Sequence, residues 1–171
     1  SDVLQDVLTY AEYGAEHKGL ELRISISENV PQKLIGDVGR MKQILDNLIS
    51  NAVKYTNEGY IEFSVDWEPA EQGGYLSVVV KDSGIGMKAE DVQKISERFI
   101  RFDKENTRNI QGIGLGLTIV TKLLHLMGSQ LEVKSEPGKG SSFSFRIKQG
   151  VADATPIGKI VSITCSIKVG G

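Results

Sequence analysis

The chain has 171 residues, of which 40% are hydrophobic and 25% charged, and its formal net charge is −2. This composition is typical of one soluble globular domain, and the charge provides no electrostatic basis for nucleic-acid binding. Cys165 is the single cysteine, which excludes an intrachain disulfide and a zinc-binding Cys/His cluster. No apolar run reaches the ~20 residues needed to cross a bilayer. We therefore expect a cytoplasmic segment without membrane contact; a membrane anchor, if the parent protein has one, lies outside it.

Hydrophobic periodicity predicts helices and strands that alternate irregularly along the chain. Predicted helices have apolar residues three and four positions apart, and predicted strands have them at every second position or in short unbroken runs. The expected order is helix 2–18, strand 20–26, helix 37–55, strands 60–67 and 75–81, helix 89–102, a helix that opens in a glycine-rich turn and ends at Met127, and strands 130–135 and 142–147. This order does not fit a doubly wound parallel sheet and favours a mixed sheet covered on one face by helices.

We expect one domain over residues 1–148 and a C-terminal tail over residues 149–171. The tail contains the breaker Thr-Pro-Ile-Gly at 155–158, and apolar residues then alternate with polar ones from Val161 to Val169. The tail is therefore expected to contain one further strand, to which the sequence assigns no chemistry.

The first candidate site lies on the polar face of the helix 37–55, where Asn47, Asn51 and Lys54 follow one another at helical spacing. Asparagine is a poor helix former, so two of them in mid-helix suggest a role beyond solvation. An amide oxygen suits Mg²⁺ that is partly held by phosphate oxygens, and a lysine can neutralise phosphate charge. An ordinary polar helix surface is the alternative interpretation.

The second candidate is Asp82-Ser-Gly84-Ile-Gly86, at the end of the strand 75–81. Glycines let the backbone approach a flat ligand closely, and a carboxylate there can accept a hydrogen bond from an exocyclic amine. Ordinary turn chemistry would explain the same residues. The segment also matches the dinucleotide-binding pattern G-x-G-x-x-A, but the required βαβ unit, with an acidic residue ~20 positions later, is missing.

The third candidate is Gly112-Ile-Gly114-Leu-Gly116-Leu117, which opens the helix that ends at Met127. Alternate glycines at a helix start expose backbone N–H groups at the positive end of the helix dipole, where polyphosphates bind well. A loose helix entry without a ligand is the alternative. A Walker A motif is absent from the sequence, since Gly138-Lys-Gly-Ser lies between strands and does not precede a helix.

Taken together and in this order, the segments resemble the catalytic ATP-binding domain of sensor histidine kinases, within the superfamily that includes gyrase, Hsp90 and MutL. The resemblance covers about residues 1–148 and implies the Bergerat-type ATP-binding fold, a two-layer α+β sandwich with a mixed, mostly antiparallel sheet. The matching motifs are the N box at 47–56, the G1 box at 82–86, the F box at 97–102, the G2 box at 112–117 and a distal glycine motif at 138–143.

The resemblance implies ATP and Mg²⁺ as cofactors. Asn51 would bind Mg²⁺ with support from Asn47, and Asp82 would bind the adenine amino group. Lys54 would contact phosphate, and Arg101 would help to hold the γ-phosphate, so Asn47, Lys54 and Arg101 are the expected catalytic residues. The other expected nucleotide contacts are Tyr55, Gly84, Ile85, Gly86, Gly112, Ile113, Gly114, Leu115, Gly116 and Leu117. The resemblance also implies a hydroxyl near the adenine. Both Ser141 and Ser142 are candidates for it, and we include Ser142 among the expected contacts.

The same resemblance implies a phosphoryl donor in two-component signalling. The chain would transfer the γ-phosphoryl group of ATP to a histidine on a separate helical hairpin, the dimerisation and phosphoacceptor domain, and would act on a response regulator only indirectly. His17 and His125 both lack the H-E-x-[KR]-x-P-like context of an acceptor histidine. The loop 103–111 would form a lid over ATP, and we expect the isolated domain to be monomeric.

Two other functions stay open, an autonomous ATPase of the gyrase or Hsp90 type and a non-catalytic nucleotide-sensing module. Gyrase-like ATPases carry a glutamate base one helical turn before the metal-binding asparagine, and here that position holds Asn47. An amide cannot take a proton from water. We therefore expect slow ATP hydrolysis by the isolated chain.

Overall fold

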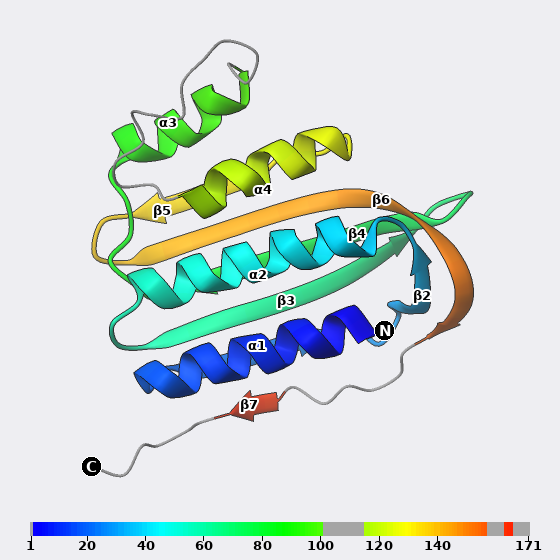
Figure 1. Cartoon of the computed structure of the whole chain (residues 1–171), viewed down its shortest axis with the longest axis horizontal. Helices are drawn as coiled ribbons and strands as arrows, with labels where there is room; N and C mark the ends of the chain where they lie inside the picture. Colours follow the sequence, from blue (N-terminus) through cyan, green and yellow to red (C-terminus); the bar gives the residue numbers. More distant parts are fainter. Residues whose placement is uncertain (1, 101–114, 157–162, 166–171) are drawn as a thin grey trace.

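The chain folds into two layers, in which helices cover one face of a sheet (Figure 1). The computed structural model describes residues 2–100, 115–156 and 163–165. Its elements in chain order are α1 Asp2–Lys18, β1 Glu21–Ile26, β2 Pro31–Ile35, α2 Val38–Tyr55, β3 Tyr60–Pro69, β4 Gly74–Asp82, α3 Ala89–Ile100, α4 Leu115–Leu126, β5 Glu132–Glu136, β6 Gly140–Pro156 and β7 Ile163–Cys165. This arrangement confirms the predicted α+β sandwich.

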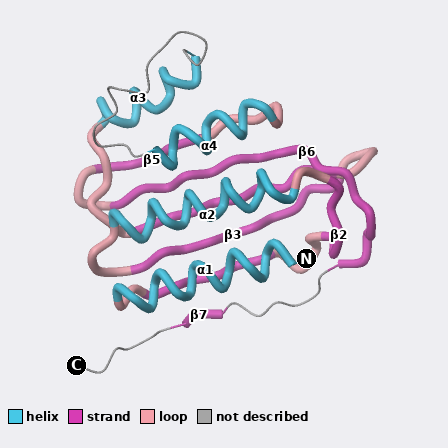
Figure 2. Tube along the Cα trace, in the orientation of Figure 1, coloured by secondary structure: helices cyan, strands magenta, loops and turns pink. Residues whose placement is uncertain are grey.

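The sheet is mixed and mostly antiparallel, as predicted. Its strand order is β2-β6-β4-β3-β1-β7, and β5 pairs with the first part of β6 (Figure 2). β1 and β3 are parallel, whereas the other strand pairs in the described part of the chain are antiparallel. A parallel pair needs a crossover connection, and the chain passes through β2 and α2 between β1 and β3.

Helix α2 lies over the sheet between α1 and α4 (Figure 1). Asp37 caps its N-terminus, because Oδ1 accepts a hydrogen bond of 3.0 Å from the N–H of Arg40. The apolar stripe of the helix is buried in one core with the inner face of the sheet, and the central members are Ile44, Leu45, Leu48, Ile49, Ala52, Phe63, Val80 and Phe143. This packing fixes the polar face of α2 relative to the end of β4.

We expect Leu48→Ala to lower the free energy of unfolding by about 2–5 kcal/mol, because Leu48 is fully buried and the smaller side chain leaves a cavity. Leu126→Ala is the matched control, since Leu126 is 56% exposed at the end of α4 and should cost about 0.5 kcal/mol or less. Urea unfolding followed by circular dichroism measures both variants. Equal losses of stability would contradict the position of Leu48 at the centre of the core.

Strand β6 is longer than the predicted strand 142–147, because its second half pairs with a strand that the sequence did not reveal. β2 pairs antiparallel with it, from Ile35 opposite Gly150 to Pro31 opposite Pro156. β2 begins with a proline and has no alternation of apolar and polar residues, so it carries no strand signal. As a result, β6 continues through residue 148, where we expected the domain to end.

Within the tail strand expected over 161–169, the structure has β7 at Ile163–Cys165, which pairs antiparallel with β1. β7 covers the edge that β1 would otherwise present. The expected lid 103–111 lies outside the described residues, as do the last residues of the predicted helix 89–102. In the described part of the chain no helix combines the length and apolar character needed to cross a membrane.

Candidate functional site

A cavity of about 300 Å³ lies where the C-terminal ends of α2 and β4 meet the first turns of α3 and α4 and the turn between β5 and β6. It brings together residues that are far apart in the sequence. Its lining consists of Asn51, Tyr55, Asp82, Ile85, Gly86, Met87, Lys88, Asp91, Leu117, Pro137, Ser141 and Phe143. Six of the predicted nucleotide contacts are in this lining: Asn51, Tyr55, Asp82, Ile85, Gly86 and Leu117.

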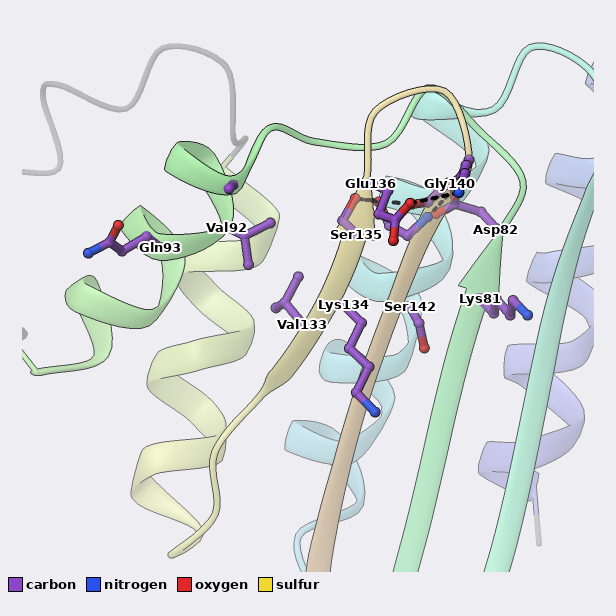
Figure 3. Close-up of a pocket in the computed structure, with 13 residues that line it drawn as sticks. Lys81, Asp82, Val92, Gln93, Val133, Lys134, Ser135, Glu136, Gly140 and Ser142 are labelled. Atoms are coloured by element: carbon purple, nitrogen blue, oxygen red, sulfur yellow. Dashed lines mark hydrogen bonds and ion pairs between the residues drawn. The ribbon is translucent and has the colours of Figure 1, made fainter.

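Asp82 is the more deeply buried of the two buried polar residues in the cavity lining, with 3% of its surface exposed against 8% for Ser141. It ends β4 opposite Ser141 of β6, and its Oδ1 accepts hydrogen bonds from the N–H of Gly84 at 2.9 Å and the N–H of Ser141 at 3.2 Å. Figure 3 shows Asp82 beside the turn between β5 and β6. In the described part of the chain both of these hydrogen bonds go to Oδ1 and none is found to Oδ2, which leaves Oδ2 available to a ligand.

The environment of Asp82 shifts the pKa of its carboxyl group upward. Burial raises the pKa because it disfavours the charged form, while the N–H groups of Gly84 and Ser141 and the nearby hydroxyl of Thr56 act in the opposite direction. The structure therefore places an acid in a site where its charge is costly unless donors surround it. Such a carboxylate is suited to accept a further hydrogen bond from a ligand.

The loop after Asp82 is held close to α2 and to the β5–β6 turn. Ile85 donates its N–H to the carbonyl of Tyr55 at 3.1 Å and accepts a hydrogen bond of 2.7 Å from the N–H of Gly138. Gly86 has φ of 68°, and a Cβ there would overlap the carbonyl oxygen of Glu136. A Cβ on Gly84 would overlap the carbonyl oxygen of Tyr55. Glycine is therefore required at both positions for this close approach.

Some residues on the polar face of α2 line the cavity, and others lie outside its lining. Asn51 and Tyr55, one turn apart, both line the cavity. Asn47 faces α4, since a Cβ on Gly116 would lie 3.6 Å from its Oδ1. Lys54 is exposed outside the cavity lining, with Nζ 5.4 Å from the ring centroid of Tyr55.

The G2 segment is described only in its second half. Leu115 begins α4, Gly116 contacts α2 beside Asn47, and Leu117 is 2% exposed in the cavity lining. The other predicted nucleotide contacts of this region, Arg101, Gly112, Ile113 and Gly114, lie outside the described residues.

Ser141, and not Ser142, faces the cavity together with Asp82. Neighbouring residues on a strand point to opposite faces of the sheet, and Ser141 shares the inner face with the buried Phe143. Ser142 lies opposite Lys81 and Lys134 on the neighbouring strands. The three side chains lie along a more open hollow (Figure 3). Ser142 therefore lies outside the lining of the smaller cavity, and its inclusion among the nucleotide contacts stays a prediction.

Several lining residues were not predicted from the sequence. Ser141 could have been chosen over Ser142 from its two-residue spacing to Phe143, which marks the inner face. Lys88 and Asp91, which flank the start of α3, carried no signal. Lys88 and Asp91 line the cavity because the start of α3 lies beside it and the helix packs against β5.

Comparisons with known proteins agree with this fold. A profile of the family described as histidine kinase-, DNA gyrase B- and HSP90-like ATPase matches residues 36–151. The hybrid signal transduction histidine kinase B of Dictyostelium discoideum is 42% identical over 154 residues, which cover 90% of this chain and 8% of that protein. The sensor protein GacS of Pseudomonas syringae pv. syringae is 40% identical over 148 residues, covering 86% of this chain and 16% of that protein.

Solved structures share the fold. Full-length ShkA in complex with AMPPNP aligns with a TM-score of 0.70 and 31% identity, over 90% of this chain and 31% of that chain. The catalytic domain of the histidine kinase ThkA aligns with a TM-score of 0.62 and 23% identity, over 86% of this chain and 90% of that chain.

The chain belongs to the family of histidine kinase-, DNA gyrase B- and HSP90-like ATPases. Within that family, the relatives named above are sensor and hybrid histidine kinases. The chain spans less than a fifth of the length of these two curated relatives.

Proposed function

We propose that this chain is the ATP-binding catalytic part of a sensor histidine kinase and donates the γ-phosphoryl group of Mg-ATP to a histidine outside the chain. One observation carries the proposal. The buried carboxylate of Asp82 has one oxygen free of donors among the described residues, and it lies in a cavity that Asn51 also lines. The cavity thus has a hydrogen-bond acceptor for a nucleobase at Asp82 and an amide that can bind a metal-phosphate group at Asn51.

The Asp82 side of the cavity fits adenine. Apolar side chains of Ile85, Met87, Leu117 and Phe143 can contact the flat base, while Oδ2 of Asp82 accepts a hydrogen bond from its exocyclic amino group. Guanine carries a carbonyl at that position, which would leave two acceptors facing each other. A calorimetric titration should therefore show binding of ATP and little binding of GTP.

The Asn51 side fits a hydrated metal held by phosphates. The described residues contain no group of three or more His, Cys, Asp or Glu that could hold a metal ion. An ion here would depend on the amide oxygen of Asn51, on phosphate oxygens and on water, which is the coordination that Mg²⁺ favours. Bound Mg²⁺ would neutralise phosphate charge, and we assign the further phosphate contacts to Lys54, Arg101 and the segment 112–117.

The acceptor histidine is proposed to lie on a helical hairpin outside this chain, with a response regulator downstream. The ring of His17 stacks with Tyr13 on α1 at a centroid distance of 6.3 Å, and His125 is exposed in the last turn of α4. Both lie outside the cavity lining. In the transfer, a nitrogen of the incoming imidazole bonds to the γ-phosphorus, the bond from that phosphorus to the bridging oxygen breaks, and ADP leaves. The chain contributes position and charge stabilisation to this step.

We expect Asn51→Ala to weaken Mg-ATP binding by at least about tenfold and to reduce the effect of Mg²⁺ on ATP affinity, because the variant removes the amide from the cavity. Asn57→Ala is the matched control, since Asn57 is exposed just after α2. Isothermal titration calorimetry with and without Mg²⁺ measures both. Equal Mg²⁺ dependence in the variant and the natural chain would reject the metal role of Asn51.

A transfer assay separates the proposed function from the two alternatives. The chain is mixed with Mg-ATP labelled on the γ-phosphorus and with a phosphoacceptor hairpin taken from a related histidine kinase. Acid-labile label on the hairpin supports the kinase. Steady phosphate release without transfer would favour an autonomous ATPase, although Asn47 cannot act as a general base. Binding of ATP with neither outcome would favour a nucleotide-sensing module.

A further inference from the structure

Thr56 carries a buried hydroxyl that has no partner. It follows the last residue of α2, its side chain is fully buried, and its Oγ1 has no hydrogen-bond partner in the described part of the chain. Leaving a buried hydroxyl without a hydrogen bond is unfavourable, because the group loses its hydration and gains no partner in return. A buried polar group without a partner in a native structure is explained either by local strain or by a function such as ligand binding.

The hydroxyl lies at the back of the adenine side of the cavity. A Cβ on Gly84 would be 2.8 Å from Oγ1, so Thr56 contacts the loop that follows Asp82. The hydroxyl also lies close enough to the carboxylate of Asp82 to favour its charged form and to lower its pKa. It is thus beside the carboxylate without completing a hydrogen bond to it.

The peptide group between Tyr55 and Thr56 is held in place by two hydrogen bonds. The N–H of Thr56 donates to the carbonyl of Val53 at 3.4 Å and ends the helix, while the preceding residue, Tyr55, accepts the N–H of Ile85 at 3.1 Å. Only the hydroxyl and the carboxylate are therefore left to adjust.

We propose that Thr56 is a positioning residue, whose hydroxyl donates to the carboxylate of Asp82 and holds it with Oδ2 directed at the amino group of the bound adenine. The inference rests on the proposed binding of ATP at this site. Oδ1 already accepts two backbone N–H groups, which fix one end of the carboxylate. A third donor restricts its rotation and keeps it charged, and a charged acceptor makes the stronger hydrogen bond.

The test compares two substitutions that separate the hydroxyl from the shape of the side chain. Thr56→Val keeps the shape and removes the hydroxyl, and we expect it to weaken ATP binding by about two- to tenfold. Thr56→Ser keeps the hydroxyl and removes a methyl group, so its ATP affinity should stay within about twofold while its melting temperature falls. The binding of purine riboside triphosphate, which lacks the amino group, should be the same in both variants and in the natural chain.

Thr121→Val is the matched control for the loss of a buried hydroxyl. Thr121 is 4% exposed, lies outside the cavity lining, and its hydroxyl donates to the carbonyl of Thr118 within α4. Thr121→Val should leave ATP affinity unchanged.

If the natural chain binds ATP and Thr56→Val binds it equally well, the role of Thr56 is overturned while the ATP site stands. Equal weakening by Thr56→Val and Thr56→Ser would assign the effect to packing and also overturn it. Absence of ATP binding by the natural chain would reject the proposed function itself.

Discussion

Asp82→Asn is expected to weaken ATP binding by about tenfold to a hundredfold, because it replaces a charge-assisted hydrogen bond to the adenine amino group. Such bonds are worth about 1.5–3 kcal/mol. The substitution keeps an oxygen that can accept the N–H groups of Gly84 and Ser141, so the loop after β4 should stay in place. Isothermal titration calorimetry at neutral pH measures the loss. Unchanged affinity would reject the adenine role of Asp82.

The same variant should be more stable than the natural chain at neutral pH. The folded state raises the pKa of the Asp82 carboxyl above its ordinary value of 3.8, mainly through burial, so the folded state binds this proton more tightly than the unfolded state. The free energy of unfolding therefore falls as the pH rises from about 3.8 through the raised pKa, and an uncharged amide removes this loss. Asp66→Asn, at an exposed position of β3, controls for the change in net charge and should alter neither property.

Gly86→Ala is expected to lower the free energy of unfolding by about 2–5 kcal/mol and to weaken ATP binding. A φ of 68° costs a residue with a Cβ about 1–2 kcal/mol, and relieving the overlap with the carbonyl of Glu136 adds about 1–3 kcal/mol. Relieving the clash requires the loop at Gly86 and the β5–β6 turn to move apart. That movement would displace Ser141 from the carboxylate of Asp82.

Gly138→Ala separates backbone strain from the clash. Gly138 has φ of 77° in the same turn region, but a Cβ there meets no atom of the described chain within 4 Å. The control should therefore cost only about 1–2 kcal/mol and leave ATP affinity close to that of the natural chain. Urea unfolding and calorimetry measure both variants. Equal effects of the two substitutions would show that the contact between Gly86 and Glu136 does not shape the cavity.

The sequence by itself determined the elements that depend on neighbours within one or two turns. The apolar stripe of α2, the alternation along β1 and β3, and a strand in the C-terminal tail were all predicted in this way. The motifs around Asn51 and Asp82 were also recognised in advance, because unusual residue types at fixed local spacing mark them. Their meeting in one cavity followed only from the resemblance to a family.

Only the tertiary structure decided how distant strands pair and which residues then share a face. β2 forms because the second half of β6 lies beside it, and the register of Asp82 opposite Ser141 turns this serine, and not its neighbour, toward the cavity. The burial of Thr56 was also decided by tertiary contacts, since the loop after β4 closes over the end of α2 and covers this side chain. Local periodicity describes one segment at a time, whereas strand register and burial are set by contacts between segments.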